Sequence, residues 1–257
     1  VSTVAIPFLK KIKRKNVKLI FLIHDLDSLR GVYKNGERQF LSTADVIIAH
    51  NPVMVDYLKQ NGYSDKEIRS LNIFDYLTQD SVAGRKDGEK TEVVIAGNLK
   101  REKAGYVYRL NEVEGEIQFR LYGPNYAGET QGKNVKYCGQ YKPEELPEKL
   151  EGGFGLVWDG DDLSGCTGVF GEYMKYNNPH KTSLYLASGL PVIIWEKAAM
   201  AKYIEKNNLG IAVREINEIP LKLKKMSEED YKTMKENVEV VGKQLCQGKM
   251  LLTVLGK

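Results

Sequence analysis

The sequence of 257 residues predicts an α/β protein built on parallel β-sheets. Two observations support this class. Short apolar runs rich in Val and Ile recur along the chain, and such runs are typical of strands that are buried on both faces. Polar or amphipathic segments of helical length separate these runs, and this alternation is the pattern of βαβ units.

The first series of elements covers residues 4–73. It opens with a helix that ends in basic residues, which suit the C-terminal end of a helix dipole. Later, Asn51 and Pro52 suit the cap and the first position of a helix, which Asn61-Gly62 would end. In chain order we expect a helix over 4–14, a buried strand over 17–23, a short helix over 37–43, a strand over 44–49, a helix over 52–59 and a weaker strand over 68–73.

A second series follows residues 78–91, a polar stretch with two glycines and no periodicity, where we expect a linker. In chain order the second series comprises strand 92–96, helix 101–112, strands 117–122 and 135–138, helix 143–150, strand 153–158, a polar loop over 159–176, a helix that begins near 179, strand 192–195, helix 197–206, strand 211–213 and a C-terminal helix over 226–254. The sequence therefore predicts two Rossmann-like lobes, residues 1–80 and 91–235, with a cleft between them. The final helix, about 236–257, is able to pack back on the first lobe.

The composition is that of an ordinary globular chain, with 42% hydrophobic and 28% charged residues. The net charge of +4 is too small and too dispersed to predict a nucleic-acid partner. No apolar run approaches the ~20 residues of a membrane-spanning helix. The three cysteines are scattered and form no CxxC pair, which favours neither disulfides nor a zinc site and fits a reducing cytoplasm.

Two features of the N-terminal segment bear on completeness and partners. Val1 stands without a preceding Met or signal peptide, and the chain opens directly at a helix that leads to a strand, so we expect a truncated N-terminal lobe. Residues 10–18 are rich in lysine, which permits peripheral contact with acidic lipids at the inner membrane face. The alternative, which is favoured, is that these lysines form the solvated C-terminal end of a helix. Self-association stays open, because no apolar stripe specifies it.

The second lobe is organised around residues 176–195, Y-N-N-P-H-K-T-S-L-Y-L-A-S-G-L-P-V-I-I-W. Asn178 suits the N-cap of a helix and Pro179 its first position. Gly189 suits the left-handed residue after the last turn. The run at 192–195 then reads as a buried parallel strand, so this stretch predicts a helix followed at once by a strand.

Lys181 conflicts with its expected place in the first helical turn, because the helix dipole already puts partial positive charge there. An anion held between the lysine and the free N–H groups of the turn would remove the conflict, since helix N-termini bind phosphate well. The alternative is a lysine that is simply solvated. The neighbouring residues favour the anion.

Other candidate residues follow predicted strands, where ligands of open α/β sheets bind. His24 and His50 each directly follow a strand and His180 lies at a helix start, so all three histidines fall where a cleft would be. Asn98 and Arg101 follow the glycine that ends one strand, and Tyr122 ends the next. Arg101 together with Lys181 can neutralise a diphosphate, and Tyr122 can stack on a nucleobase or donate to phosphate.

The acidic run Asp159-Gly160-Asp161-Asp162 has two interpretations. Its carboxylates suit Mg²⁺ or Mn²⁺ held together with substrate phosphates. Asp and Gly are also good turn formers, and no other ligand set accompanies them, so a turn is favoured. No GxGxxG, Walker or GxSxG motif is present, which disfavours dinucleotide oxidoreductases, P-loop NTPases and α/β-hydrolases.

Several segments resemble the GT-B glycosyltransferases. G-G-F-G-L-V-W at 152–158, the stretch at 176–195 and A-A-M-A-K-Y-I-E-K-N-N-L-G-I-A-V at 198–213 are similar to the C-terminal lobe of that class. F-L-I-H-D-L-D-S-L-R at 21–30 and A-G-N-L-K-R at 96–101 are similar to further parts of it. The chain looks most like bacterial galactofuranosyltransferase-like proteins and the glucosyltransferases that extend O-glycans on streptococcal serine-rich adhesins.

The resemblance implies a UDP-sugar donor that is bound mainly by the C-terminal lobe, without a metal cofactor. Lys181 and Arg101 match the residues that contact the diphosphate, while Asn98 and Tyr122 match positions at the nucleotide. The segment that wraps the nucleotide corresponds here to Asn178, Pro179, His180, Lys181, Thr182 and Ser183. Two departures exist: about two βα units before Ala5 are lacking, and Glu172 has no partner glutamate at the family's usual spacing, which leaves the stereochemistry open.

The resulting prediction is a GT-B glycosyltransferase that moves a hexose (galactofuranose, glucose or galactose) from a UDP-sugar to a glycan, lipid-linked or glycoprotein acceptor. His24 and Asp25 would face the acceptor, with Asp25 as a candidate base or, alternatively, a cap of its loop. A second hypothesis is a non-catalytic sugar-nucleotide-binding partner of another glycosyltransferase, and a third is an interaction module without a working cleft.

Overall fold

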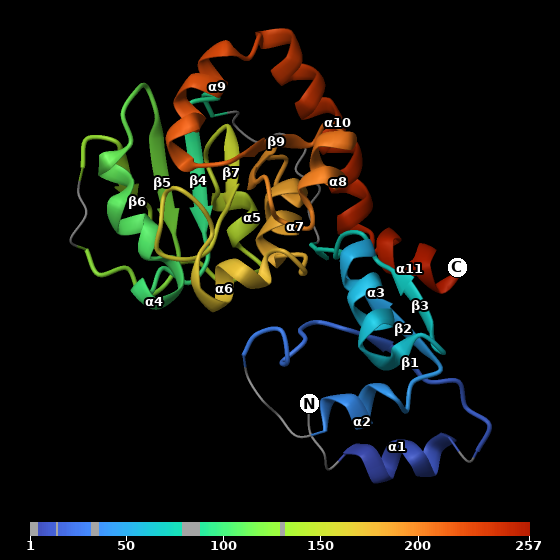
Figure 1. The fold of residues 1–257 in the computed structure, drawn as a ribbon. Helices are drawn as coiled ribbons and strands as arrows, with labels where there is room; N and C mark the ends of the chain where they lie inside the picture. The colour runs from blue at the N-terminus through green and yellow to red at the C-terminus, as the bar shows by residue number, and fades with distance from the viewer. Residues whose placement is uncertain (1–4, 14, 32–35, 79–87, 129–131) are drawn as a thin grey trace.

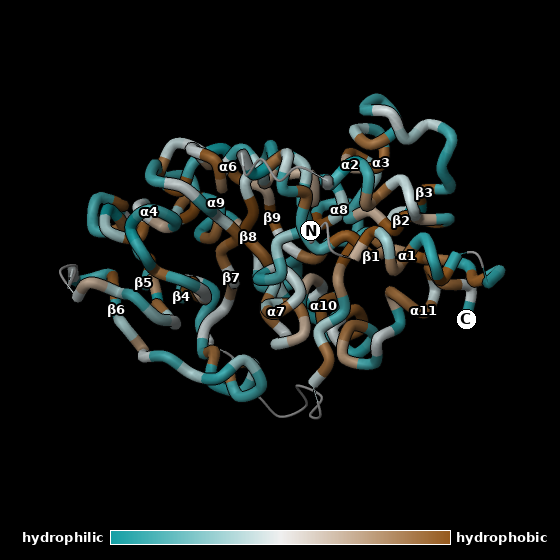
Figure 2. The backbone as a smooth tube through the Cα atoms, turned by 90° about the horizontal axis from the view of Figure 1, so that it is seen from below, coloured by the Kyte–Doolittle hydropathy of each residue, from teal (hydrophilic) through white to brown (hydrophobic). Residues whose placement is uncertain are grey.

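In the computed structural model, residues 5–13, 15–31, 36–78, 88–128 and 132–257 are described, and they form two parallel β-sheets covered by helices (Figure 1). The predicted α/β class is confirmed. The tube is brown along much of β7 and β8 in Figure 2, where these strands cross the interior, and teal over many outer segments. The apolar core therefore lies along the strands, as their sequence pattern requires.

The first sheet has three strands in the order β1-β2-β3, all parallel. Its strands are β1(Ile20–Leu22), β2(Val46–Ala49) and β3(Glu67–Ser70), and its helices are α1(Ala5–Lys13), α2(Glu37–Leu41) and α3(Pro52–Leu58). The strand expected over 17–23 is shorter and less buried than predicted. Among the described residues, β2 is the one strand that pairs with it, and Val17 and Ile20 remain 46% and 41% exposed.

The predicted start and end of α3 are confirmed. Oδ1 of Asn51 accepts from the N–H of Met54 over 3.0 Å, and Pro52 occupies the first position. A π-helical turn, η1(Lys59–Tyr63), follows, and its backbone leaves helical geometry at Asn61 and Gly62. Local chemistry therefore determines this helix.

The second sheet has six parallel strands in the order β6-β5-β4-β7-β8-β9. They are β4(Glu92–Ala96), β5(Gln118–Tyr122), β6(Val135–Tyr137), β7(Phe154–Val157), β8(Val192–Trp195) and β9(Gly210–Val213). Every residue of β7 and β8 is buried. The helices and 3₁₀ turns of this part are α4(Arg101–Ala104), η2(Gly105–Glu112), α5(Leu146–Lys149), α6(Gly168–Tyr173), α7(His180–Ala187), α8(Ala201–Lys206), η3(Ile216–Glu218), α9(Ile219–Lys225), α10(Glu228–Cys246) and α11(Lys249–Leu255).

Three helix predictions need correction. The loop expected over 159–176 contains α6, which has glycines at two of its six positions and so lacks a helical sequence pattern. The helix expected over 101–112 is α-helical only to Ala104 and continues as 3₁₀ turns. The C-terminal helix is broken at Gly248, whose φ of +71° is left-handed, into α10 and α11.

Helix α11 packs against the first sheet (Figure 1). The two carboxylate oxygens of Asp75 accept from the N–H groups of Met250 and Leu251 over 2.9 and 2.8 Å, which satisfies the N-terminus of α11. At its other end Arg69 donates to the carbonyl of Val254 over 2.7 Å. We propose a division into lobes near residues 78–91, although 79–87 lie outside the described part of the chain.

Candidate functional site

A cavity of about 330 Å³ lies between the two lobes. The first lobe lines it with His24 and Asp25, which follow β1, and with Arg30. The second lobe contributes the backbone after β4, Asp159 after β7, and the first turn of α7. The carboxyl ends of strands from both sheets therefore meet at one site, as expected for open α/β sheets.

The start of α7 differs from the prediction. Pro179, not Asn178, is the N-cap residue, and no side chain caps the helix. The Asn178 side chain is instead drawn into contacts with the first lobe. The end of the helix is as predicted: Gly189 has φ +70°, and β8 follows at Val192 between β7 and β9.

A close contact between α7 and the sheet places the first turn of the helix at the cavity. The fully buried Tyr185 accepts from the N–H of Ala96, at the end of β4, over 2.7 Å. Its ring lies over Gly155 of β7, where an added Cβ would be 2.2 Å from Tyr185 Cγ. The glycine therefore lets the helix approach the sheet closely.

Lys181 lines the cavity but is neither solvated nor uncompensated. Its Nζ lies 2.9 Å from Oδ1 of Asp159 and donates to the carbonyl of Trp158 over 2.8 Å. Asp159 thus offsets the unfavourable position of a lysine near the helix N-terminus. Anion binding by Lys181 stays a prediction, and an anion would share the ammonium group with Asp159.

Lys103 is a residue that sequence reasoning missed. It lines the cavity, and burial lowers its pKa; Asp159 opposes this effect, whereas the charges of Lys181 and Arg30 add to it. The guanidinium of Arg101, the predicted partner of Lys181, instead stacks over the ring of Tyr108 at 4.0 Å. Residues two apart on a helix point in different directions, so only one of these cations faces the cavity.

Gly97 and Asn98 follow β4. Gly97 has φ +140°, and the space where a Cβ would stand is empty, which leaves room for a ligand against the backbone. Asn98 lines a small adjoining cavity of about 30 Å³ together with Lys103 and Lys181. Its Oδ1 accepts from the N–H of Lys100, which holds the turn in shape.

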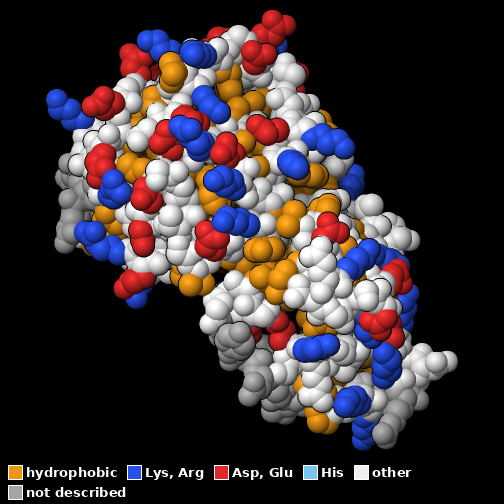
Figure 3. Space-filling view, in the orientation of Figure 1, with side chains coloured by type: hydrophobic (Ala, Val, Ile, Leu, Met, Phe, Trp, Pro, Cys, Tyr) orange, Lys and Arg blue, Asp and Glu red, His pale blue; other side chains and the backbone are white. Residues whose placement is uncertain are grey.

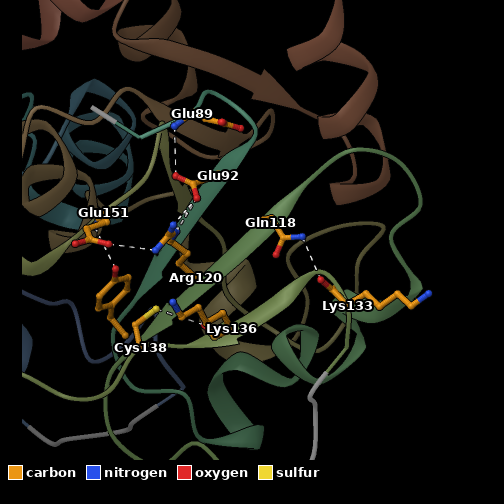
Figure 4. A network of polar contacts seen from close by, with 9 residues as sticks. Glu89, Glu92, Gln118, Arg120, Lys133, Lys136, Cys138 and Glu151 are labelled. Atoms are coloured by element: carbon orange, nitrogen blue, oxygen red, sulfur yellow. Dashed lines mark hydrogen bonds and ion pairs between the residues drawn. The ribbon is translucent and has the colours of Figure 1, made fainter. Parts of the chain in front are cut away.

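Tyr122 does not line the cavity. Its side chain is buried, and its hydroxyl accepts from the N–H of Glu151 over 3.1 Å. Burial raises the pKa of Tyr122 to about 12. Figure 4 shows the surrounding network, in which Arg120 lies between Glu92 and Glu151. Tyr122 therefore supports the sheet, and its ring is not presented to a nucleobase.

The three histidines gather around Phe74. The rings of His24 and His180 line the cavity and stack on Phe74 with centroids 5.5 and 4.4 Å away. His50 packs edge-on behind Phe74 at 4.8 Å and is fully buried, so it does not face the cavity. Burial lowers the pKa of His180, and lowers that of His50 to about 4.

The remaining predicted residues divide between the cavity and the interior. Asp25 lies 2.8 Å from Arg30, and both line the cavity, as does Pro179. Thr182 and Ser183 are buried in α7 away from it. Asn178 borders the cavity, but the polar atoms of its side chain bond to the first lobe.

The acidic run after β7 forms a turn in which Gly160 has φ +110°. Asp159 pairs with Lys181, while Asp162 accepts from the N–H and hydroxyl of Ser164. Within the described ranges, no three His, Cys, Asp or Glu side chains are grouped so that they could hold a metal ion.

Comparison with known proteins places this chain in a family. Residues 3–73 match the family model described as glucosyltransferase 3-like, N-terminal domain, and residues 93–257 match the C-terminal domain. Beta-1,6-galactofuranosyltransferase WbbI of Escherichia coli (strain K12) is 41% identical over 93% of this chain and 70% of its own length. Glucosyltransferase 3 of Streptococcus parasanguinis is 29% identical over 90% of this chain and 66% of its own length.

Solved structures share the arrangement of the two lobes. Anabaena Alr3699/HepE in complex with UDP-glucose has a TM-score of 0.60 at 14% identity, covering 100% of this chain and 77% of that one. Sucrose-phosphate synthase from Thermosynechococcus elongatus has a TM-score of 0.59 at 15% identity, covering 96% and 69%. These likenesses establish the GT-B fold. The chain therefore belongs to the glucosyltransferase 3-like family of GT-B glycosyltransferases.

Proposed function

We propose that this chain transfers a hexose from a UDP-sugar to a glycan, lipid-linked or glycoprotein acceptor. The observation that carries the proposal is the convergence of Lys103 and Lys181 on one cavity, beside the open backbone of Gly97. The related WbbI is a galactofuranosyltransferase, and the HepE structure contains UDP-glucose, which supports a donor of this class.

The charges around the cavity suit a diphosphate. Three cations, Lys103, Lys181 and Arg30, line it with two carboxylates, Asp25 and Asp159, which leaves a net charge of +1 from three minus two. Cations fixed in a partly dry site stabilise negative charge that develops on a leaving nucleoside diphosphate. We propose that the lysines fill this role without a metal ion.

The acceptor is proposed to enter from the first lobe. His24 and Asp25 lie on that side of the cavity, and the ion pair with Arg30 fixes the Asp25 carboxylate. A carboxylate so placed can accept the proton of an attacking sugar hydroxyl. Asp25→Asn should therefore abolish most transfer while UDP binding persists, and transfer at the wild-type rate would remove Asp25 from this role.

Cytoplasmic location and contact with the inner membrane face are also proposals. No described helix is long and apolar enough to span a bilayer. At α1, Phe8 is 63% exposed beside exposed Lys10 and Lys11, a combination that suits an acidic lipid surface. Figure 3 shows Lys and Arg side chains at the lower end of the molecule, where α1 lies in Figure 1.

The nucleotide site is tested by calorimetry with UDP on the wild type and three variants. Lys103→Met and Lys181→Met should each weaken binding about tenfold or more, which corresponds to ~1.4 kcal/mol. Arg101→Met is the matched control and should change affinity less than about threefold, because Arg101 stacks on Tyr108. If Arg101→Met lost UDP binding and Lys103→Met kept it, Arg101 and not Lys103 would be the residue that binds the diphosphate.

The UDP titration of the wild type, together with a turnover assay, separates the alternatives. UDP binding without turnover of UDP-galactofuranose, UDP-glucose or UDP-galactose would favour a non-catalytic sugar-nucleotide-binding partner of another glycosyltransferase. No UDP binding by the wild type would favour an interaction module.

A further inference from the structure

A buried asparagine of the second lobe directs its side chain to the first lobe. Asn178 directly precedes the N-cap of α7 and is 2% exposed. Its Nδ2 donates to the carbonyls of His50 and Asn72 over 2.5 and 3.0 Å, and its Oδ1 accepts from Nδ2 of Asn51 over 2.7 Å. Its backbone N–H donates to Nδ1 of His50 over 2.9 Å. Both N–H groups of this side chain are therefore used within the protein, and its Oδ1 already accepts one hydrogen bond from the first lobe.

The residues around Asn178 are themselves fixed by the first lobe. His50 and Asn51 directly follow β2, the central strand of the first sheet. Oδ1 of Asn51 caps α3 while its Nδ2 meets Asn178 and the carbonyl of Tyr176. Asn72 follows β3 with φ +69°, a conformation that asparagine tolerates better than most residues. Partners from three positions of the first lobe, each held by its own backbone or side-chain contacts, thus surround the Asn178 side chain.

A second bond between the lobes lies close to the first. The hydroxyl of Tyr173, the last residue of α6, accepts from the N–H of Leu26 over 3.0 Å, and its ring joins the core of the first lobe. Leu26 directly follows Asp25 in the first lobe. In the second lobe, Asn178 lies just before the turn that carries Lys181. We call residues 173–178 the seam. It joins the loop that carries Asp25 to the turn that carries Lys181.

We infer that Asn178 is a positioning residue, which aligns the phosphate-binding turn of the second lobe with the acceptor side of the first, and is not a nucleotide ligand. His180 and Lys181 lie two and three residues beyond it, and His180 stacks with His24 across the cavity at 5.8 Å. A shift at Asn178 therefore changes the distance between donor and acceptor. This inference rests on the proposed function, because alignment matters only if the cavity holds both substrates.

Two variants test it. Asn178→Ala removes all the side-chain bonds. Asn51→Asp keeps an oxygen for the N–H of Met54, so α3 stays capped, but loses the amide donor to Asn178 and Tyr176. Asp75→Asn is the matched control, because it weakens the attachment of α11 to the first lobe and is not among the cavity residues.

The measurements are UDP affinity, donor turnover and hydrogen exchange. Asn178→Ala and Asn51→Asp should each bind UDP within about twofold of the wild type. With octyl β-glucoside as acceptor and each of the three UDP-hexoses as donor, transfer should fall at least tenfold while donor hydrolysis by water persists. Asp75→Asn should leave the ratio of transfer to hydrolysis unchanged. Hydrogen exchange of the UDP-free protein should accelerate at 24–31 and 176–183 in Asn178→Ala and Asn51→Asp, but not in Asp75→Asn.

Three outcomes would overturn the inference: UDP affinity that falls in Asn178→Ala as far as in Lys103→Met, a transfer-to-hydrolysis ratio that stays at the wild-type value, or unchanged hydrogen exchange at both segments. If the wild type turns over none of the donors, the proposed function fails, and the hydrogen-exchange comparison still decides whether Asn178 holds the lobes together.

Discussion

Stability of this protein should depend on pH through His50. The ring is 1% exposed, and its Nδ1 accepts from the N–H of Asn178, so the neutral ring carries its proton on Nε2. Nε2 has no hydrogen-bond partner in the described part of the chain. Protonation would place a charge in this buried site and remove the acceptor, so burial lowers the pKa from 6.5 to about 4.

The sign and size of the effect follow from linkage. Between these two pKa values the unfolded chain binds a proton that the folded chain does not, so acid favours unfolding there. One pKa unit corresponds to about 1.4 kcal/mol, so the full contribution of His50 is about 3 kcal/mol. It is fully present above pH 6.5 and is lost as the pH falls toward 4.

Urea unfolding followed by the fluorescence of Trp158 and Trp195 measures this dependence. Between pH 6.5 and pH 5 the wild type should lose about 2 kcal/mol more than His50→Gln, which cannot titrate at this position. The other ionisable groups are common to both chains, so their contributions cancel in the comparison. Equal losses in the two proteins would show that His50 is protonated without penalty, which would refute this account of its environment.

Two further predictions concern the contact that places α7. Tyr185→Phe leaves the N–H of Ala96 without its acceptor, and urea unfolding should show a loss of about 1–3 kcal/mol; an unchanged stability would mean that another acceptor replaces the hydroxyl. Gly155→Ala would put Cβ 2.2 Å from Tyr185 Cγ, so we expect a loss of at least about 1–3 kcal/mol. If Gly155→Ala unfolded at the same temperature as the wild type, α7 would be able to move away from the sheet without loss of stability.

Much of the fold could be predicted because it depends on short-range rules. The strand at 92–96 and the strand at 192–195 have the predicted bounds, since short runs rich in Val and Ile between turn residues are typical of buried parallel strands. Asn51-Pro52 starts α3, and Gly189 ends α7, because caps are decided by a few neighbouring atoms. The two edge strands of the first sheet, β1 and β3, are shorter than predicted, since the pairing of an edge strand depends on its single neighbour.

The residues of the candidate site were harder to predict from the sequence than the fold. Residues that follow predicted strands do line one cavity: His24 and Asp25 follow a strand of the first sheet, and Gly97 follows a strand of the second. The choice between Arg101 and Lys103 depended on the rotation of a four-residue helix, which no local pattern specifies. Tyr122 ends a strand as predicted, but the side chain follows the buried face of the sheet.

The sequence by itself determined the alternation of strands and helices, the cap of α3 and the glycine that ends α7, because these depend on contacts between residues close in the chain. Only the tertiary structure decided what Asn178 does. A local rule makes it an N-cap, yet its partners His50, Asn51 and Asn72 lie more than a hundred residues away. A buried amide is satisfied by whichever partners the packed lobes bring to it, and three such partners outweigh one helix N–H.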